Sequence, residues 1–338
     1  MPFYQLAARI PLIEGHIPVF GLSHKFIGGG PKRFYQLFKM ITKPAETSPR
    51  GFWMGSFYQV IVDDLEQLQE LLASKHCIDK ADFYDVLFFT KGILLSGGSL
   101  WRTHRKIIEP AFNLNILKGF IPIFNEKTKI FLDKVGERVN GPLFDISELT
   151  APLALDNILT TSTGLRKDIQ TDKNNKFLEH CMMAMHVGAT RLSKFWLHVD
   201  AIYKWTSVYA LEKKHVWEGM YATADEVIKQ KEAEGFDAKD VENEESTHKP
   251  QIFIDQLFKK REAFTNEEII HEVNTIIVTG FETVSNTMSM ITLILALHPE
   301  VQDKVFDELQ SVFKTIDEEV TDDHLSKLTY LEIGILIK

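Results

Sequence analysis

An acid and a hydroxyl stand side by side in the most apolar part of the chain. Glu282 and Thr283 follow Gly280 within a long run of mostly apolar residues. An acid beside a hydroxyl can move protons by general acid–base catalysis. Gly280 lowers helix stability by about 1 kcal/mol relative to alanine, and Thr283 can turn its hydroxyl onto a preceding carbonyl, so a helix would be loosened here. The alternative is structural: a close helix crossing at Gly280, with Glu282 on a hydrated edge.

A second cluster combines an indole with cationic side chains. Trp101 and Arg105 are four residues apart and therefore share one face of a helix. The indole supplies an N–H donor and a flat apolar wall, and the guanidinium pairs with a carboxylate through two hydrogen bonds. Together they suit a ligand that carries carboxylates on an apolar skeleton. Arg102 and Lys106 form a neighbouring cationic face. A solvated basic face with one anchoring tryptophan is the alternative.

The first cluster requires a long helix over residues 265–298. Thr265 and Glu268 form a capping box at its start, and His298-Pro299 ends it because proline cannot continue the hydrogen-bond ladder. At about 1.5 Å per residue the helix is roughly 50 Å long. Residues 283–299 carry no formal charge, but they include polar residues and fall short of the ~20 apolar residues of a membrane span. We therefore predict a buried central helix.

The rest of the sequence predicts a helical body behind a small β element. Aromatic and β-branched residues over 52–62 favour a hairpin turning at Gly55-Ser56, and Asp64 opens a short amphipathic helix. Proline-rich residues 1–50 indicate irregular structure, and acidic residues 232–245 indicate a solvated loop. Further helices are expected at 99–108, 118–139, 145–164, 174–190, 203–232, 251–260 and 299–313. We expect a single domain over 1–338, with an N-terminal region (1–98) and a mainly α-helical body (99–338).

Composition restricts the class of protein. Of 338 residues, 44% are hydrophobic and 25% are charged, which is typical of a globular chain. The net charge of −9 argues against nucleic acid as a partner of the whole surface, and the 24 phenylalanines indicate a roomy apolar interior. Cys77 and Cys181 do not form a disulfide framework or a zinc motif, so no metal ligands are predicted. His271-Glu272 begins like a zinc-protease motif, but Thr275 stands where its second histidine would be.

Taken in this order, the two clusters resemble the cytochrome P-450 family of heme-thiolate monooxygenases. The Trp-x-x-x-Arg at 101–105 looks like the family's C helix, and the Gly-x-Glu-Thr at 280–283 looks like its I helix. Residues 298–305 resemble the start of the J helix, and 52–62 resemble the first β hairpin. The resemblance covers residues 1–332 and is greatest to the microsomal, insect-type family-four clan. It implies a mainly α cytochrome P-450 fold.

The resemblance also implies a role for each site residue. Trp101 and Arg105 would bind a propionate of heme b. Gly280 would let the heme and bound oxygen lie against the long helix. Thr283, at the same cofactor-binding face, would stabilise the activated oxygen and guide protons, and Glu282 would connect Thr283 to solvent.

Partners and location follow from the same resemblance. Arg102 and Lys106 would meet the acidic surface of an NADPH-cytochrome reductase, which supplies electrons from NADPH. The substrate would be a small apolar molecule, such as a fatty acid, a hormone or a xenobiotic. The protein would act at the cytoplasmic face of the endoplasmic reticulum membrane. Because this sequence contains no anchor, a cytoplasmic location is the alternative.

The sequence departs from the family pattern at several positions. Val284 replaces a usual threonine or serine, and Thr279 replaces a glutamate that can link covalently to heme, so no such link is expected. Residues 328–332 look like the opening of the K helix, but its Glu-x-x-Arg pair does not follow, and neither Cys77 nor Cys181 lies in a heme-ligand loop. We therefore expect a chain that is incomplete at both ends and inactive by itself. The alternative class is a heme-free, non-catalytic helical binding or interaction protein.

Overall fold

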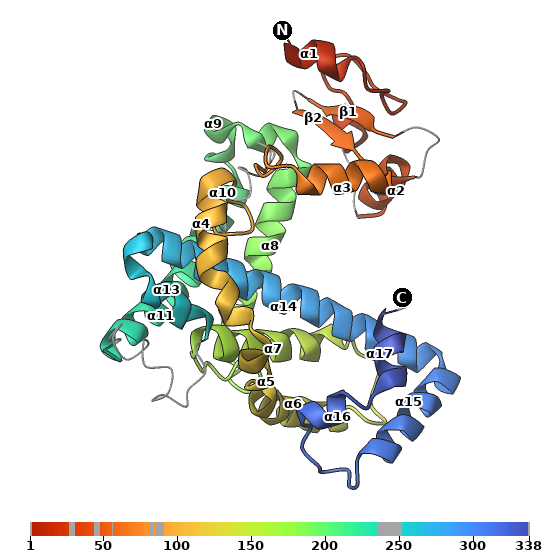
Figure 1. Cartoon of the computed structure of the whole chain (residues 1–338), viewed down its shortest axis with the longest axis vertical. Coiled ribbons are helices and arrows are strands. Elements are labelled where there is room, and N and C mark those ends of the chain that lie inside the picture. The colour runs from red at the N-terminus through yellow and green to blue at the C-terminus, as the bar shows by residue number, and fades with distance from the viewer. Residues whose placement is uncertain are drawn as a thin grey trace. The chain divides into compact units, whose positions relative to one another are not determined.

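A computed structural model describes residues 2–26, 31–43, 48–55, 57–80, 84, 91–235 and 252–336. The described part of the chain is mainly helical and contains one two-stranded antiparallel sheet near the N-terminus (Figure 1). This confirms the predicted fold class, a mainly α protein with a small β element.

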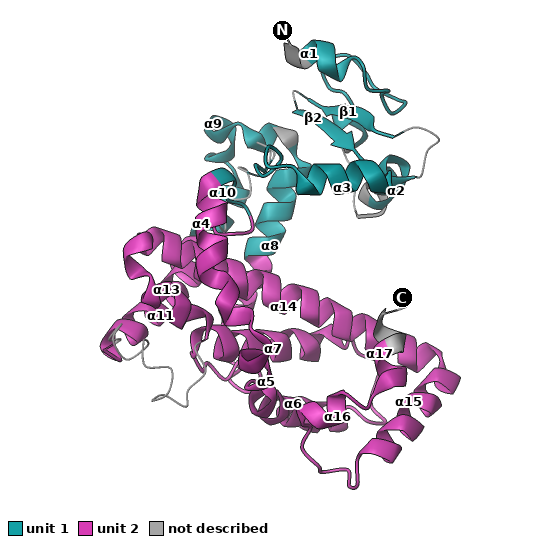
Figure 2. Ribbon diagram, in the orientation of Figure 1, with its two compact units in different colours: residues 1–88, 95–98, 184–213 teal, residues 89–94, 99–183, 214–338 magenta. Residues whose placement is uncertain are grey.

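The chain divides into two compact units, and neither is a continuous stretch of sequence (Figure 2). Unit 1 comprises residues 1–88, 95–98 and 184–213, and unit 2 comprises residues 89–94, 99–183 and 214–338. Residues 184–213 therefore belong with the N-terminal region, which no sequence pattern indicated. The single domain over the whole chain stays a prediction.

In unit 1 the hairpin forms where aromatic and β-branched residues predicted it. Strand β1 (Arg50–Met54) pairs antiparallel with β2 (Phe57–Ile61), and Trp53 lies opposite Tyr58. The two rings are 4.8 Å apart, and such cross-strand aromatic pairs stabilise hairpins. Gly55 adopts a φ of +60° at the turn, and Ser56 lies outside the described residues.

Helix α3 (Leu65–Ala73) begins as predicted after the hairpin. The Asp64 side chain accepts a hydrogen bond from the backbone N–H of Gln67 at 2.9 Å. This N-cap satisfies one of the backbone donors that every helix start leaves without a partner.

The prediction of irregular structure over residues 1–50 was wrong in part. Unit 1 contains α1 (Pro2–Ala7), η1 (Ser23–Phe26) and the 12-residue α2 (Pro31–Thr42). Pro31 is the first residue of α2, a position where the missing N–H costs nothing and the fixed φ suits a helix. A proline that starts a helix was thus interpreted as one that prevents it.

The helix predicted over 203–232 is interrupted. Helix α9 (Asp200–Tyr203) ends, and the Thr206 side chain then accepts from the N–H of Tyr209 at 3.3 Å to cap α10 (Ser207–Glu212). After α10 the helix changes to a π-helical segment, η6 (Lys213–Tyr221), and then continues as the α-helix α11 (Ala222–Ala233). Threonine can cap a helix or lie inside one, and apolar periodicity does not distinguish the two. Of the acidic loop predicted over 232–245, residues 236–245 lie outside the described residues.

Unit 2 consists of helices in its described part. In chain order they are α4 (Gly98–Ile108, whose first residue is in unit 1), η3 (Glu109–Phe112), α5 (Leu114–Lys118), α6 (Ile121–Gly136), α7 (Ser147–Ile158), the π-helical η4 (Leu159–Thr163), α8 (Phe177–Ser193, whose end is in unit 1, as is the following η5, Phe195–His198), η6, α11, α13 (Phe253–Lys259), η7 (Arg261–Ala263), α14 (Asn266–Leu297), α15 (Pro299–Val312), α16 (Asp322–Leu325) and α17 (Thr329–Leu336). The helices predicted at 99–108, 145–164, 251–260 and 299–313 are confirmed to within a few residues.

The centre of unit 2 is the contact between α14 and α7. The Thr150 hydroxyl lies 3.3 Å from Ser285 Oγ and 2.7 Å from Ser289 Oγ, while Ile158, two turns further along α7, lies against Gly280. Higher numbers on one helix thus meet lower numbers on the other, so the two helices run antiparallel. The predicted start of α14 is confirmed, because Thr265 and Glu268 form both bonds of the capping box.

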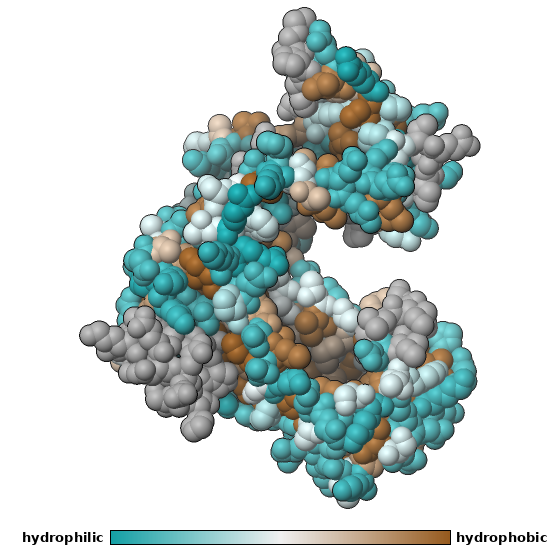
Figure 3. Space-filling model, viewed as in Figure 1, coloured by the Kyte–Doolittle hydropathy of each residue, from teal (hydrophilic) through white to brown (hydrophobic). Residues whose placement is uncertain are grey.

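The prediction that α14 is a buried helix was wrong for its second half. The buried side chains of α14 all lie between Ile269 and Ser285, whereas Met290, Leu293 and Leu297 are exposed. Figure 3 shows apolar surface, in brown, on the face of unit 2 near α14. By length and composition α14 could cross a membrane, and 11% of its most apolar window is buried in the structure. A core helix meets the same criterion, and the buried first half fits a core helix.

Candidate functional site

A buried histidine and a buried glutamate join the two helices that carry the predicted site residues. His104 Nδ1 of α4 lies 2.8 Å from Glu272 Oε1 of α14, and the two side chains are 2% and 0% exposed. Neither residue was predicted as part of a site. Two sequence features could have identified them. His104 lies four residues before Ile108, on the same face of α4, and Glu272 is an acid within the mostly apolar α14.

The same carboxylate also holds the segment before α4. The backbone N–H of Ile93 donates to Glu272 Oε2 at 2.9 Å. Gly92 packs so closely that a Cβ would stand 2.3 Å from Thr275 Oγ1 and 2.9 Å from Glu272 Oε2. Glu272 therefore connects three segments of unit 2, and Gly92 cannot be replaced without moving one of them.

Trp101 and Arg105 lie away from this buried contact. Trp101 is half-buried, and the Arg105 side chain is 56% exposed. The Arg105 guanidinium is 4.0 Å from Glu109 Oε1, itself 68% exposed, and such exposed pairs contribute at most about 1 kcal/mol. The guanidinium is thus available for a carboxylate ligand beside an apolar ring. Arg102 and Lys106 are both exposed, as a cationic face requires.

Gly280 lies at the close helix crossing that was the structural alternative. A Cβ at Gly280 would stand 2.6 Å from both Cγ1 and Cδ1 of Ile158 on α7. The space beside Gly280 is therefore filled by a neighbouring helix. A cofactor next to Gly280 would therefore have to contact the adjoining backbone of α14, because Ile158 fills the space at the Gly280 Cα.

We expect Gly280→Ala to destabilise the chain by about 1 kcal/mol, because overpacking costs about 1–3 kcal/mol and alanine regains up to about 1 kcal/mol of helix propensity. In an Ile158→Ala background the contact is gone, so the same substitution should become stabilising. Urea unfolding of the four variants measures this reversal of sign. Equal effects in the two backgrounds would contradict the crossing.

Neither Glu282 nor Thr283 of α14 is fully buried. Thr283 is exposed, and its hydroxyl donates to the Thr279 carbonyl at 2.7 Å. Thr279 donates in turn to the Thr275 carbonyl at 2.7 Å. The Thr283 oxygen can still accept a hydrogen bond, since a hydroxyl oxygen has two lone pairs.

Partial burial raises the pKa of the Glu282 carboxyl above its usual range. In the described part of the chain no ion pair or side-chain hydrogen bond of Glu282 opposes this shift. A raised pKa brings a carboxylic acid closer to neutral pH, where it transfers protons more effectively. An acid of this kind, one residue before a hydroxyl on the same helix, is of a type that can exchange protons with solvent. Within the described residues, no hydrogen bond or ion pair links this pair to Trp101 or Arg105.

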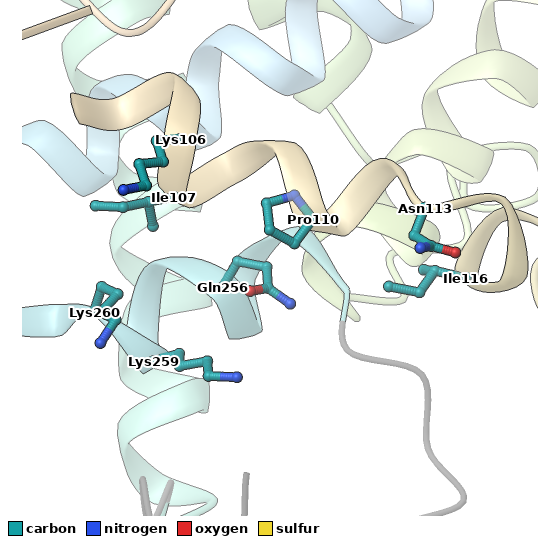
Figure 4. Close-up of a pocket in the computed structure, with 8 residues that line it drawn as sticks. All are labelled: Lys106, Ile107, Pro110, Asn113, Ile116, Gln256, Lys259 and Lys260. Carbon is teal, nitrogen blue, oxygen red and sulfur yellow. The ribbon is translucent and has the colours of Figure 1, made fainter. Parts of the chain in front are cut away.

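A basic groove opens between the end of α4 and α13 (Figure 4). Its volume is about 600 Å³, and its lining includes Lys106, Lys259 and Lys260 together with Ile107 and Pro110. None of the three lysines forms an ion pair within the described residues. The groove therefore offers three cationic groups around an apolar floor, which suits an anionic partner.

The two cysteines differ in burial. Cys181 is completely buried on α8, and this burial raises the pKa of its thiol, so the thiolate is strongly disfavoured. Cys77 is exposed. Among the described residues no group of three or more His, Cys, Asp or Glu side chains is arranged to hold a metal ion. The exposed Arg105 guanidinium thus suits a carboxylate-bearing group, whereas the buried Cys181 thiol does not suit an iron ion.

Comparison with known proteins gives the class. The family model for cytochrome P-450 matches residues 11–335, so the chain belongs to the cytochrome P-450 family. This confirms the family that the sequence motifs indicated.

Individual relatives carry family-four names. The chain is 28% identical over 300 residues to cytochrome P-450 4c3 of Drosophila melanogaster, covering 84% of this chain and 56% of that protein. It is 29% identical over 290 residues to cytochrome P-450 4c21 of Blattella germanica, covering 83% and 58%. It is 26% identical over 349 residues to human cytochrome P-450 4V2, covering 98% and 65%. The chain thus spans somewhat more than half the length of the first two.

Proposed function

We propose that the chain supplies part of a heme-dependent monooxygenase that inserts one atom of dioxygen into a small apolar substrate, such as a fatty acid, a hormone or a xenobiotic. Bound heme b would supply the oxygen-activating iron, with electrons from NADPH delivered by a reductase. The observation that carries the proposal is that two helices of unit 2 hold the two halves of the chemistry. Helix α4 presents an available guanidinium beside an indole, and α14 presents an acid beside a hydroxyl.

The chain's own side chains would divide the work as follows. Arg105 would pair with a heme propionate, and Trp101 would cover the apolar skeleton beside it and donate its indole N–H. Thr283 would accept a hydrogen bond at the reacting face, and Glu282 would take protons from solvent and pass them to Thr283. Gly280 would keep α14 against α7, so that the backbone around Thr279 stays in place.

The axial thiolate would come from a cysteine other than Cys77 and Cys181. Without thiolate ligation the iron lacks the electron donation that favours O–O cleavage. We therefore propose that the 338-residue chain is inactive by itself.

The test is a reduced carbon monoxide difference spectrum. The chain supplied with heme should lack the Soret band of a thiolate-ligated iron, and a product of the same gene that extends into a heme-ligand cysteine loop should show it. If the extended product binds no heme, the non-catalytic alternative, a helical binding or interaction protein, would replace this proposal. A thiolate Soret band from the 338-residue chain would overturn the assignment of the two cysteines.

We expect Arg105→Ala in the extended protein to weaken heme retention. The propionate would lose a charge-assisted partner, at a cost of about 1–3 kcal/mol. Transfer of heme to excess apomyoglobin measures the release rate, and Arg102→Ala on the neighbouring face is the matched control. Equal release rates for the two variants would assign Arg105 to the solvated face.

The reductase is proposed to dock on the cationic face of Arg102 and Lys106, extended by Lys259 and Lys260 of the basic groove. Reversing charge at Lys106 and Lys259 should raise the KM for the reductase and weaken its dependence on salt, since steering by surface charge is screened by ions. Unchanged salt dependence would exclude this surface. Such docking fits the proposed location at the cytoplasmic face of the endoplasmic reticulum membrane.

A further inference from the structure

We propose that His104 and Glu272 are positioning residues: their buried contact fixes the rotation of α4 about its own axis and so directs Trp101 and Arg105. This inference rests on the proposed function for the identity of the ligand that Trp101 and Arg105 meet. The contact itself is independent of that function. His104 Nδ1 and Glu272 Oε1 are 2.8 Å apart, and both side chains are almost fully excluded from solvent.

Helix geometry shows why this contact controls the two site residues. At about 100° per residue, Trp101 lies roughly 60° and Arg105 roughly 100° around α4 from His104, on the same side. Both therefore stand to one side of the His104 contact. A rotation of α4 by one residue would turn the indole and the guanidinium together away from their present direction.

The partner on α14 lies on the stripe that carries the Thr283 hydroxyl of the proposed proton relay. Thr279 and Thr283 lie within roughly 20° of the direction of Glu272 around α14, about 10 and 16 Å further along its axis. The stripe changes from buried at Glu272 to exposed at Thr283. One contact thus relates the α4 pair to the face of α14 that carries the Thr283 hydroxyl.

Apolar contacts alone would not fix this rotation. Ile108 and Ala111 are buried below His104, but apolar surfaces can slide with little directional cost. A hydrogen bond between two side chains loses strength steeply with angle and distance. Each partner also has a second contact. The Phe264 ring lies 4.5 Å from the His104 ring, and the Ile93 N–H donates to the other oxygen of Glu272.

The first experiment measures the direction of Trp101 in the 338-residue chain. In a background with Trp53, Trp196, Trp205 and Trp217 changed to Phe, Trp101 is the only indole, and acrylamide quenching reports its exposure. His104→Phe keeps an aromatic ring but removes the donor, and Glu272→Leu removes the acceptor. Each should change the quenching constant, and the double variant should change it no further, because both substitutions remove the same contact.

The conservative variant and the control separate positioning from general loosening. Glu272→Gln should restore the native quenching, because the amide oxygen can accept from Ile93 while its NH₂ donates to His104 in the other tautomer. Thr150→Ala removes the hydroxyl that lies 2.7 Å from Ser289 Oγ and so loosens α14 without touching α4. At a similar loss of unfolding stability, it should leave Trp101 unchanged. The proposal is wrong if Thr150→Ala alters the quenching as much as His104→Phe, or if His104→Phe does not alter it.

The second readout is heme release from the extended holoprotein. We expect roughly tenfold faster release in His104→Phe and Glu272→Leu, in the range expected for a misdirected charged hydrogen bond, and near-native release in Glu272→Gln. If the wild-type extended protein holds no heme, the proposed function fails, while Trp101 quenching still decides the role of the pair. Native release rates in both variants, with quenching changed, would limit the pair to aligning α4 and would overturn its action on heme.

Discussion

Thr283→Ala in the heme-loaded, extended protein is expected to lower the product formed per NADPH consumed at least roughly tenfold, because general acid–base groups typically contribute about 10²–10⁴-fold. Protons would no longer reach the reacting oxygen in order, and reduced oxygen would leave as peroxide. Folding should be nearly unchanged, since Thr283 is exposed and alanine is the better helix former. Product and peroxide, measured side by side, give the outcome.

Glu282→Gln completes this prediction, because it removes the acid while keeping its shape. Burial raises the folded-state pKa of Glu282 above its unfolded value, so the folded state binds more protons and stability falls as pH rises through that interval. The glutamine variant should therefore slow turnover while slightly raising the free energy of unfolding at neutral pH. Thr287→Ala, one turn beyond Thr283 and with the same back-bond to a carbonyl at 2.8 Å, is the matched control. Full coupling in Thr283→Ala would end the relay assignment.

Asp156→Ala is expected to destabilise the chain by about 3–5 kcal/mol, which is the cost of removing the buried partner of a buried ion. Asp156 and Lys127 are each 1% exposed, with Lys127 Nζ 3.8 Å from Asp156 Oδ2. The Asp156 carboxylate also accepts from the backbone N–H groups of Ile169 at 3.0 Å and Gln170 at 3.3 Å. Urea unfolding followed by far-UV circular dichroism measures the loss.

Two comparisons test the cause of that loss. Lys127→Met in the Asp156→Ala background should recover part of the stability. It keeps the volume and removes a buried charge whose other carboxylates, on Glu126 and Asp168, are 3.9 and 4.0 Å away. Glu148→Gln, which breaks the exposed 3.9 Å pair with Arg138, should change stability by less than about 1 kcal/mol. A loss for Asp156→Ala no larger than that of Glu148→Gln would mean that the buried pair contributes little to the fold.

Local patterns predicted the elements whose causes are local. The capping box of Thr265 and Glu268, the Asp64 cap and the aromatic hairpin were all found where a few neighbouring residues determine them. The π-helical segments η4 and η6 were not predicted, because over 5 and 9 residues an apolar pattern does not distinguish a π-helix from an α-helix. The grouping of 184–213 with the N-terminal region depends on contacts distant in sequence.

The candidate site shows the same limit. Types and spacing identified Trp101 with Arg105, and Glu282 with Thr283, as separate clusters. The connection between their helices depends on His104 and Glu272, which are 168 residues apart. A buried acid and a buried histidine each look like isolated anomalies until the fold brings them together. Gly280 was ambiguous for a related reason: its neighbour Ile158 lies on another helix.

The discontinuous make-up of unit 1 affects how the protein is synthesised. Its last stretch, 184–213, follows the end of its first stretch at residue 88 after almost a hundred intervening residues. At about 5–20 residues per second, the hairpin and α3 emerge from the ribosome roughly 5–20 s before the rest of their unit. During that interval the apolar side chains that later pack against residues 184–213 are accessible to chaperones. Slow codons between residues 88 and 184 should therefore lower the yield of folded protein more than slow codons after residue 214.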